Sequence, residues 1–321
     1  MRRVLILVLS LSAAAPATAD SSDIAATPLT AASGVVAAPV VGRLDYLAGF
    51  ELTSADGDWG GISGASITPD GGTLTAVADT GMWHRLSLRH DADGRLTAIE
   101  GSESGRLKGE DGSPLADKGV GDAESVARGA DGSYYVTFEG WHRLWRYRPA
   151  SDPLQATAGY VRPPKGMTSL PMNEGVEAVA VLPDGRFLLL SEGGRTKAGD
   201  LLGWVGSSKR WSEVGLVPTD AFRPTDLTVL PTGDLLLLER RVSLFGGFAA
   251  RLSVIPASDI EPGARLVGRE LGIIAKPLPV DNFEAVAAHA GPDGAVLIYL
   301  LSDNNFSAIQ RTLLLQFRWR P

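Results

Sequence analysis

One pattern constrains the fold of this chain more than any other: an apolar strand, a tight turn, and a second apolar strand that ends in an acidic residue. Its clearest copy has predicted strands at residues 176–182 and 186–191, joined by Pro183-Asp184-Gly185. Runs of Val and Leu with few charges are typical of strands buried on both faces, and Pro-Asp-Gly is a strong signal for a reverse turn. The segment therefore predicts a β-hairpin. Because the turn lies at one end, Glu177 and Glu192 must emerge together at the other end.

The same pattern occurs five times, with its turn at positions 69, 130, 183, 231 and 292, a spacing of 48 to 61 residues. A period near fifty residues with two strong strands in each repeat is typical of the blades of a β-propeller, which add weaker outer strands. In such a ring, the first strand of every hairpin lines the central channel. The acidic positions of the copies are Asp79 alone, Glu124 with Glu139, Glu177 with Glu192, Asp226 with Glu239, and Glu284 with Asp303.

The repeats predict an all-β chain that folds as a single β-propeller. Five blades are visible, and residues 86–120 have a turn signal of their own and are long enough for a sixth, degenerate blade. Residues 43–52 and 311–318 alternate like strands but have no hairpin of their own. If both join the last blade, the N- and C-terminal strands close the ring by pairing, which removes an exposed edge.

The N-terminal residues differ from the repeats. Residues 1–19 contain two arginines, an apolar run and Ala17-Thr18-Ala19, the pattern of a secretory signal peptide that is cleaved between Ala19 and Asp20. Residues 20–42 are rich in Ala, Thr, Pro and Val, and we expect them to form a flexible linker before a propeller domain at 43–321. The chain has no Cys for a disulfide or a lipid anchor. We therefore expect a periplasmic or secreted protein.

Charge and missing motifs narrow the function. A formal net charge of −7 argues against nucleic acid or an anionic membrane surface as the partner. The chain lacks a P-loop, a dinucleotide-binding fingerprint, H-E-x-x-H and C-x-x-C, so nucleotide, nicotinamide and zincin chemistry have no support. It also lacks the G-x-S-x-G nucleophile elbow of an α/β-type serine esterase. We expect a monomer that acts on a small molecule.

The carboxylates are the strongest candidates for chemistry. Inner-strand acids from different blades converge on the channel axis, where they repel unless a cation, arginines or shared protons compensate. An excess of oxygen ligands, with no Cys and four His, suits Ca²⁺ or Mg²⁺ better than zinc. We therefore predict a Ca²⁺ site at this end of the channel. Its candidate ligands are Glu124, Glu177, Asp226, Glu284, Glu192 and Asp303.

Basic residues lie beside the acids. Arg195 follows Glu192 by three residues, and Arg240 directly follows Glu239. Such arginines neutralise acids or hold an anionic substrate next to a metal. The alternative interpretation is structural, because a carboxylate repeated in each blade can bond the backbone amides of a neighbouring blade and only fix the ring. The candidate catalytic residues are Glu177, Glu284, Arg195 and Arg240.

Aromatic residues also lie in predicted loops on the acidic edge. His84 occupies the loop after the first hairpin, where a surface position without a role is the leading interpretation. Most Trp residues of a propeller pack between blades or at the rim, but Trp59, Trp83 and Trp141 enter or leave hairpins beside the acids. These three are exceptions to the packing interpretation.

Hairpins of the form Glu-Ala-Val-Ala…Pro-Asp-Gly…Ser-Glu, as at 177–192, resemble the bacterial "esterase-like activity of phytase" family of secreted propellers. Asn282-Phe283-Glu284-Ala285-Val286 and the exported N-terminus add to the resemblance, which covers residues 43–321. It implies a phytase-like propeller with calcium ions and a phosphate ester at an acidic channel mouth. No catalytic motif of the family is carried over to particular residues.

Two classes of function follow. The first is an exported hydrolase of a small phosphate or other ester, in which Ca²⁺ polarises the ester while Arg195 or Arg240 holds the anion. The second is a non-catalytic periplasmic propeller that binds a metal and a ligand, or a lactonase-like propeller. Phosphate chemistry usually calls for several basic side chains aimed at the site. The available ones are Arg195, Arg240, Arg241, Lys197 and Lys165.

Overall fold

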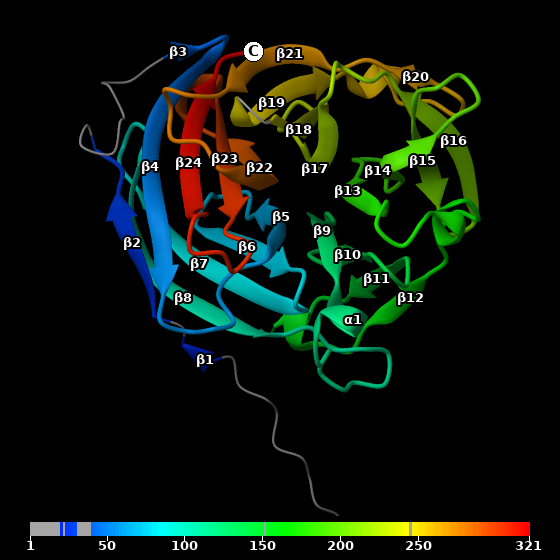
Figure 1. Ribbon diagram of the computed structural model, residues 1–321, viewed down its shortest axis with the longest axis horizontal. Coiled ribbons are helices and arrows are strands. Elements are labelled where there is room, and N and C mark those ends of the chain that lie inside the picture. Colours follow the sequence, from blue (N-terminus) through cyan, green and yellow to red (C-terminus); the bar gives the residue numbers. More distant parts are fainter. Residues whose placement is uncertain (1–19, 22, 31–39, 151, 244–245) are drawn as a thin grey trace, which may run out of the picture.

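Five β-sheets surround a central axis in the computed structural model of the protein (Figure 1). The structure describes residues 20–21, 23–30, 40–150, 152–243 and 246–321. In this part of the chain, the first strand of every predicted hairpin is the innermost strand of a sheet, and the second strand pairs with it antiparallel. The prediction of an all-β, single propeller is confirmed, with five blades.

Each blade is built outward from the channel. Blade 1 contains β5 (Ile62–Ile67), β6 (Thr73–Ala78), β7 (Met82–His90) and β8 (Leu96–Arg106). Blade 2 contains β9 (Ala123–Arg128), β10 (Tyr134–Phe138), β11 (Arg143–Tyr147) and β12 (Gly159–Val161). Blade 3 contains β13 (Val176–Val181), β14 (Phe187–Arg195), β15 (Leu201–Ser207) and β16 (Arg210–Leu216), with β20 (Arg265–Leu266) at its edge.

The last two blades follow the same plan. Blade 4 contains β17 (Arg223–Val229), β18 (Leu235–Ser243), β19 (Gly247–Ile255) and β21 (Arg269–Ile274). Blade 5 contains β22 (Asn282–Ala290), β23 (Val296–Asp303), β24 (Thr312–Trp319) and β4 (Leu44–Ser54). Helical turns in the connections are α1 (Lys118–Gly121), η2 (Pro153–Gln155), η3 (Met167–Ser169), η4 (Ala257–Asp259) and η5 (Pro292–Gly294).

The alternative of a sixth blade within residues 86–120 is wrong. Most of the hairpin β7–β8 lies in this stretch, and β7 pairs with β6, so the two strands complete blade 1. The stretch is described throughout, and after β8 it contains an isolated bridge and α1 but no further strand. Residues 86–120 are long because they contain most of two long outer strands and the connection to blade 2.

The predicted closure of the ring is confirmed. β24 pairs with β23 on one side and with β4, from the other end of the chain, on the other side. The expected linker at 20–42 needs a correction, because its described residues contain strands. β1 (Asp20–Ser21) pairs with β8, while β2 (Ile24–Pro28) and β3 (Val40–Val41) pair with β4.

The correction has a physical reason: β8 and β4 are the outermost long strands of their blades and offer backbone groups that a neighbouring segment can pair with. The predicted signal peptide at 1–19 lies outside the described residues. No helix among the described residues is long and apolar enough to cross a bilayer.

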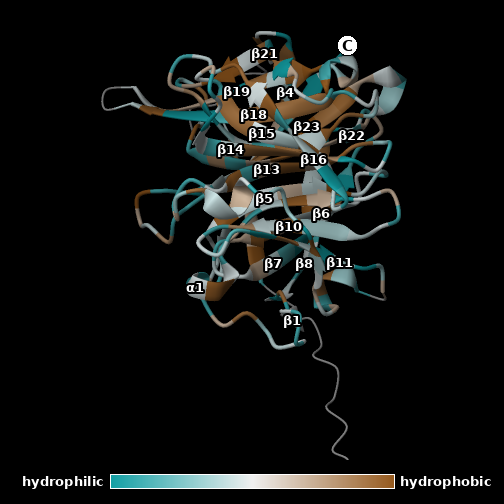
Figure 2. Ribbon diagram, turned by 90° about the vertical axis from the view of Figure 1, so that its right-hand side faces the viewer, coloured by the Kyte–Doolittle hydropathy of each residue, from teal (hydrophilic) through white to brown (hydrophobic). Residues whose placement is uncertain are grey.

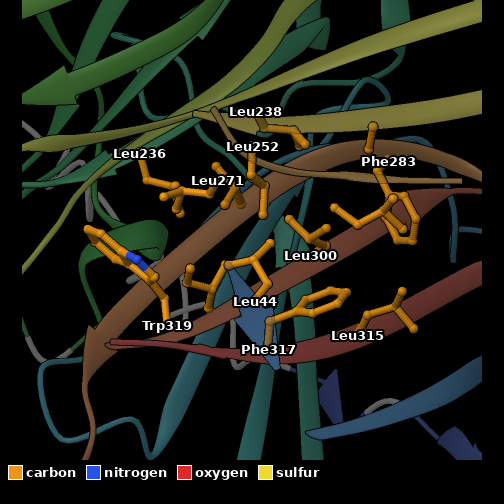
Figure 3. Packing of buried hydrophobic residues seen from close by; sticks show 14 of the residues in the cluster. Leu44, Leu236, Leu238, Leu252, Leu271, Phe283, Leu300, Leu315, Phe317 and Trp319 are labelled. Carbon is orange, nitrogen blue, oxygen red and sulfur yellow. The ribbon is translucent and has the colours of Figure 1, made fainter. Parts of the chain in front are cut away.

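Apolar side chains hold adjacent blades together. Five clusters of buried residues each lie between two neighbouring blades. In the cluster between blades 4 and 5, Leu236 and Leu238 of β18 are grouped with Leu300 of β23 and with Leu315 and Phe317 of β24 (Figure 3). Burying a side chain of this size contributes about 1.5–3 kcal/mol. The stacked strands of the blades are seen from the side in Figure 2.

The two ends of the channel differ, as the hairpin pattern predicts. At one end, Pro69, Pro183 and Pro231 from three hairpin turns line a pocket of about 370 Å³ with mostly apolar neighbours. At the other end, acidic residues of four of the five hairpins line a separate pocket of about 280 Å³. The fold therefore collects the carboxylates at one end of the channel.

Candidate functional site

A β-bulge in every innermost strand positions one residue of each hairpin, and this residue is an acid in blades 2, 3 and 5. In all five blades one residue of this strand is left without a partner in the pairing register. A bulge bends the strand and re-aims the extra side chain. The five bulged residues are Ser63, Glu124, Glu177, Thr225 and Glu284.

A second ring comes from the ends of the second strands. These residues directly follow the partners of the residue before each bulge. They are Asp79, Glu139, Glu192, Arg240 and Asp303. All members of the two rings except Thr225, together with Ile62, Lys118 and two asparagines, form a pocket that we call the acidic mouth. Its lining is Ile62, Ser63, Asp79, Lys118, Glu124, Glu139, Asn173, Glu177, Glu192, Arg240, Glu284, Asp303 and Asn305.

Blade 4 departs from the sequence prediction by one residue in each strand. Asp226 and Glu239 were paired with the acids of the other blades, but Thr225 and Arg240 occupy the matching positions. Glu239 is instead buried inside the blade, where it forms an ion pair with Arg251. The turn proline at 231 would have revealed the shift, because counting from the turn in blades 2 and 3 gives 225 and 240.

Asp226 lies on the axis below the acidic mouth and joins inner strands of other blades. Its Oδ2 accepts hydrogen bonds from the backbone N–H groups of Ala65 in β5, at 3.2 Å, and Val286 in β22, at 2.8 Å. Its Oδ1 accepts from Ser125 Oγ in β9, at 2.7 Å, and Ser125 Oγ in turn accepts from Val179 N–H in β13, at 3.2 Å. All five innermost strands therefore meet in one network, which we call the hub.

The hub makes the structural interpretation correct for one carboxylate. Asp226 is fully buried, and the residues at the matching position of the other blades are small: Gly64, Ser125, Ala178 and Ala285. A Cβ added at Gly64 would lie 2.6 Å from the Cα of Ser125, so the inner strands approach too closely for a larger residue there. Burial raises the pKa of Asp226 to about 8, although its hydrogen bonds oppose the shift.

The partly buried acids of the acidic mouth have other carboxylates as neighbours. Burial and then the charges of Glu192 and Glu139 raise the pKa of Glu177 well above its ordinary value, and a hydrogen bond with Glu124 opposes this. Burial raises the pKa of Glu124 well above its ordinary value too, and Glu177 and Asp122 add to the shift. Two such carboxylates in contact require a shared proton or a cation at neutral pH.

Arg240 is the basic residue of the second ring. Its Nη1 lies 3.2 Å from Glu284 Oε1 and donates to Asn282 Oδ1 at 2.6 Å. Burial raises the pKa of Glu284 to about 7, with Arg240 opposing the shift. Burial likewise raises the pKa of Asp303 to about 6, although this carboxylate accepts hydrogen bonds from Ile62 N–H and Asn305 N–H.

One group of acids has the spacing of a metal site. Carboxylate oxygens of Asp122, Glu124 and Glu139 lie within 4.8 Å of one another. Lys118 Nζ lies 2.6 Å from Asp79 Oδ2 and 3.2 Å from Asp122 Oδ1, so one ammonium partly neutralises the group. The other oxygen of Asp79 is buried and has no hydrogen-bond partner among the residues that the structure describes. The donor set therefore fits a hard divalent cation such as Ca²⁺.

Sequence reasoning missed two residues of this group. Asp122 and Lys118 precede the hairpin of blade 2. They have no counterpart in the repeats of the other blades, because α1 occurs only in this connection among the described residues. Asp122 precedes the bulged Glu124 by two residues, and its carbonyl accepts a hydrogen bond from Glu139 N–H at 2.8 Å. That spacing from a predicted inner acid was the available signal.

The remaining candidates lie apart from the acidic mouth or in the core. Arg195 is exposed at the end of β14, where its Nη1 is 3.5 Å from the carbonyl of Gly199. The structure therefore brings Arg240 to the acids but not Arg195. His84 is buried beside Trp59, not on the surface, and burial lowers its pKa to about 4. Trp83 is buried as well, whereas Trp141 is 65% exposed.

Comparison with known proteins identifies a family. The sequence profile of the phytase-like proteins, described as "esterase-like activity of phytase", matches residues 57–306. No curated protein matches the chain in sequence.

Three similar solved structures show how far the likeness of fold extends. A PQQ-bound aldose sugar dehydrogenase from Streptomyces coelicolor is 14% identical, with 88% of this chain and 100% of that chain covered and a TM-score of 0.45. For a putative gluconolactonase the identity is 13%, the coverage 82% and 90%, and the TM-score 0.40. For a virginiamycin B lyase from Staphylococcus aureus these values are 12%, 85% and 99%, and 0.40. We draw no functional conclusion from likenesses this distant.

Proposed function

This chain belongs to the phytase-like family, described as "esterase-like activity of phytase", and we propose that it is an exported, divalent-cation-dependent hydrolase of small phosphate or other esters. The observation that carries the proposal is the acidic mouth, where seven carboxyl groups and two basic groups share a pocket of about 280 Å³. Export rests on the sequence of residues 1–19 alone.

The cation would be held by the acids of blade 2 and their neighbour in blade 3. Asp122, Glu124 and Glu139 offer oxygens at compatible spacing, and Glu177 adjoins Glu124. When bound, Ca²⁺ would polarise the ester and lower the pKa of a bound water. The ion would also compensate carboxylates that otherwise repel one another.

Residues of the chain itself would supply orientation and proton transfer. Arg240 reaches the acidic mouth from blade 4, and its guanidinium can hold a phosphate or carboxylate oxygen by charge-assisted hydrogen bonds. Glu284 lies 3.2 Å from Arg240, and its pKa of about 7 lets it accept and return a proton near neutral pH. The site thus combines an anion-holding group and a proton-transfer group on adjacent blades.

Hydrolysis of two chromogenic esters tests the proposal. We expect release of 4-nitrophenol from 4-nitrophenyl phosphate or 4-nitrophenyl acetate in millimolar Ca²⁺, and loss of the activity in chelator. Glu177→Gln should lower kcat/KM by at least about tenfold, whereas Arg195→Gln should leave it within about twofold. If wild-type protein hydrolyses neither ester with Ca²⁺, the proposal is wrong and a non-catalytic, ligand-binding role takes its place.

A further inference from the structure

Two pairs of exposed apolar side chains flank the acidic mouth. On one side, Trp141 is 65% exposed and Met172 is 71% exposed. The N–H of Gly140 donates to the carbonyl of Met172 at 3.4 Å, so the loops that carry this pair touch. Glu139 and Asn173, which adjoin these loops, line the acidic mouth. We call Trp141 and Met172 the first edge.

A second pair lies where blade 5 meets blade 1. Phe306 is 49% exposed and Ile309 is 91% exposed, in the loop that leaves β23. Asn305, directly before Phe306, lines the acidic mouth. We call Phe306 and Ile309 the second edge. Large apolar side chains that stay exposed beside a polar pocket mark contact sites, because removing their surface from water on binding is favourable.

Trp141 is held in place despite its exposure. The guanidinium of Arg143 lies 5.0 Å from the ring of Trp141 and 4.2 Å from that of Trp145. Nη1 of Arg143 also donates to the carbonyl of Trp141 at 3.0 Å. Arg143 itself is only 2% exposed. A buried cation therefore fixes the ring of the first edge from below.

Phe306 is held in an unfavourable backbone conformation. Asn305 and Phe306 have φ values of 48° and 51°, a region that a bulky residue rarely adopts. Asp303 Oδ1 accepts from Asn305 N–H at 2.9 Å, and Asn304 Oδ1 accepts from Phe306 N–H at 2.9 Å. Strain of this kind persists only where surrounding groups enforce it, and it concentrates at binding sites.

Two glycines make room for this ring. Gly60 and Gly61 have positive φ values of 148° and 65°, and a Cβ added at either would lie 3.0 Å from the Phe306 ring. Phe306 thus packs on the backbone just before β5 while half of it stays open to solvent. Burial alone would not require a loop that holds Phe306 at a positive φ.

We propose that the two edges bind the apolar part of the substrate, so that the ester carries one compact charged or reactive group and one bulky aryl or acyl group. This inference rests on the proposed function for the reactive half of the ligand. The compact group would enter the acidic mouth between Glu177 and Arg240, and the apolar group would lie against Trp141 or Phe306. A polyphosphorylated polyol would instead place charged groups against both edges.

A pair of non-hydrolysable anions tests the inference without needing turnover. Phenylphosphonate and methylphosphonate share one head group, so their ratio of dissociation constants reports contact with the apolar group. Isothermal titration in millimolar Ca²⁺ should show phenylphosphonate binding about tenfold more tightly, because burial of the phenyl ring removes apolar surface from water and so adds to the free energy of binding. At least one of Trp141→Ala and Phe306→Ala, the variant at the edge that holds the phenyl ring, should reduce the ratio to about threefold or less.

Tyr160→Ala is the matched control, because Tyr160 is 57% exposed on the outer strand β12 and should leave the ratio unchanged. Phe306→Gly removes the ring and suits the positive φ, so it keeps the test valid if Phe306→Ala folds poorly. Equal affinities for the two phosphonates, no binding of phenylphosphonate, or an unchanged ratio in both edge variants would overturn the inference.

Hydrolysis separates this inference from the function on which it rests. The protein could cleave esters with no preference for 4-nitrophenyl hexanoate over 4-nitrophenyl acetate and bind the two phosphonates equally. This result would overturn the inference and leave the hydrolase proposal standing. A clear phosphonate ratio with no ester cleaved would overturn the hydrolase proposal and support a binding role for the two edges.

Discussion

The hub and the acidic mouth place carboxylates at adjacent positions of the innermost strands, the bulge and the residue after it, with opposite results. Asp226 accepts three hydrogen bonds from inner strands of other blades. Glu177 has Glu124, Glu139 and Glu192 as its electrostatic neighbours. A buried acid that the fold satisfies stabilises the ring, whereas acids that face one another create a demand for a cation or a proton. The proposed function therefore rests on the acids of the mouth.

The same comparison explains why the two sites respond differently to pH. Burial raises the pKa of Asp226 and of the mouth acids Glu284 and Asp303 above their unfolded values. In this range the folded protein binds more protons than the unfolded chain, so stability falls as pH rises through the folded pKa. A cation can replace the protons of the mouth but cannot reach those of the hub.

The largest expected effect comes from breaking the hub. Asp226→Ala leaves Ala65 N–H, Val286 N–H and the Ser125 hydroxyl without their acceptor, at about 1–3 kcal/mol for each buried group. We expect the free energy of unfolding to fall by roughly 3–5 kcal/mol, measured by urea denaturation. Thr225→Ala, at the adjacent buried position, should cost less than about 1 kcal/mol. Wild-type stability in Asp226→Ala would contradict the hub.

A smaller effect comes from supplying the mouth with calcium at different pH values. At a hundredfold excess over Kd, calcium should stabilise the fold by about 2.7 kcal/mol, which corresponds to a rise in Tm of several degrees. The rise should be larger at pH 8 than at pH 5, because burial raises the pKa of the proposed ligands Glu124 and Glu177 well above its ordinary value, and protons compete with the cation at the lower pH.

Melting curves in calcium and in chelator across this pH range provide the measurement. In chelator, Tm should fall as pH rises from 5 to 8, and calcium should remove most of that fall. The part of the fall that comes from Asp226, whose pKa is about 8, should persist in calcium, because this carboxyl group lies in the hub. A calcium effect that is the same at pH 5 and pH 8 would show that the mouth carboxylates are not the ligands.

The smallest effect separates two arginines that the sequence treats alike. Arg240→Gln removes the ion pair with Glu284 and the group that faces an anionic substrate, so kcat/KM for 4-nitrophenyl phosphate should fall about tenfold, or about 1.4 kcal/mol. Arg195→Gln changes an exposed side chain outside the mouth, so this variant should keep kcat/KM within about twofold of the wild-type value. Equal losses in the two variants would remove Arg240 from the site.

Periodicity predicts most of the fold. The hairpin turns and the Val- and Leu-rich strands were enough to predict the five blade repeats, the closure by β4 and β24, and the collection of acids at one end of the channel, but not to exclude a sixth blade. Strands β1, β2 and β3 were missed because two- to five-residue segments pair only where a long edge strand is already in place.

The site is harder to predict because a bulge changes which residue faces the channel. In blade 4 an acid stands one position away from the repeat in each strand, so residue type suggested Asp226 and Glu239 where the backbone presents Thr225 and Arg240. Lys118 and Asp122 come from a connection that no other blade repeats. In blade 4, the distance from the turn is therefore a better guide to the ring than residue type.

Calcium titration of three proteins by calorimetry tests the central claim most directly. Wild-type protein should bind calcium, Glu177→Gln should bind it at least about tenfold more weakly, and Asp226→Asn, which keeps the shape of the hub, should bind it with wild-type affinity. That result would place the cation among the acids of the mouth and leave Asp226 with the fold. No binding by wild-type protein, or equal loss in the Glu177 and Asp226 variants, would contradict the account.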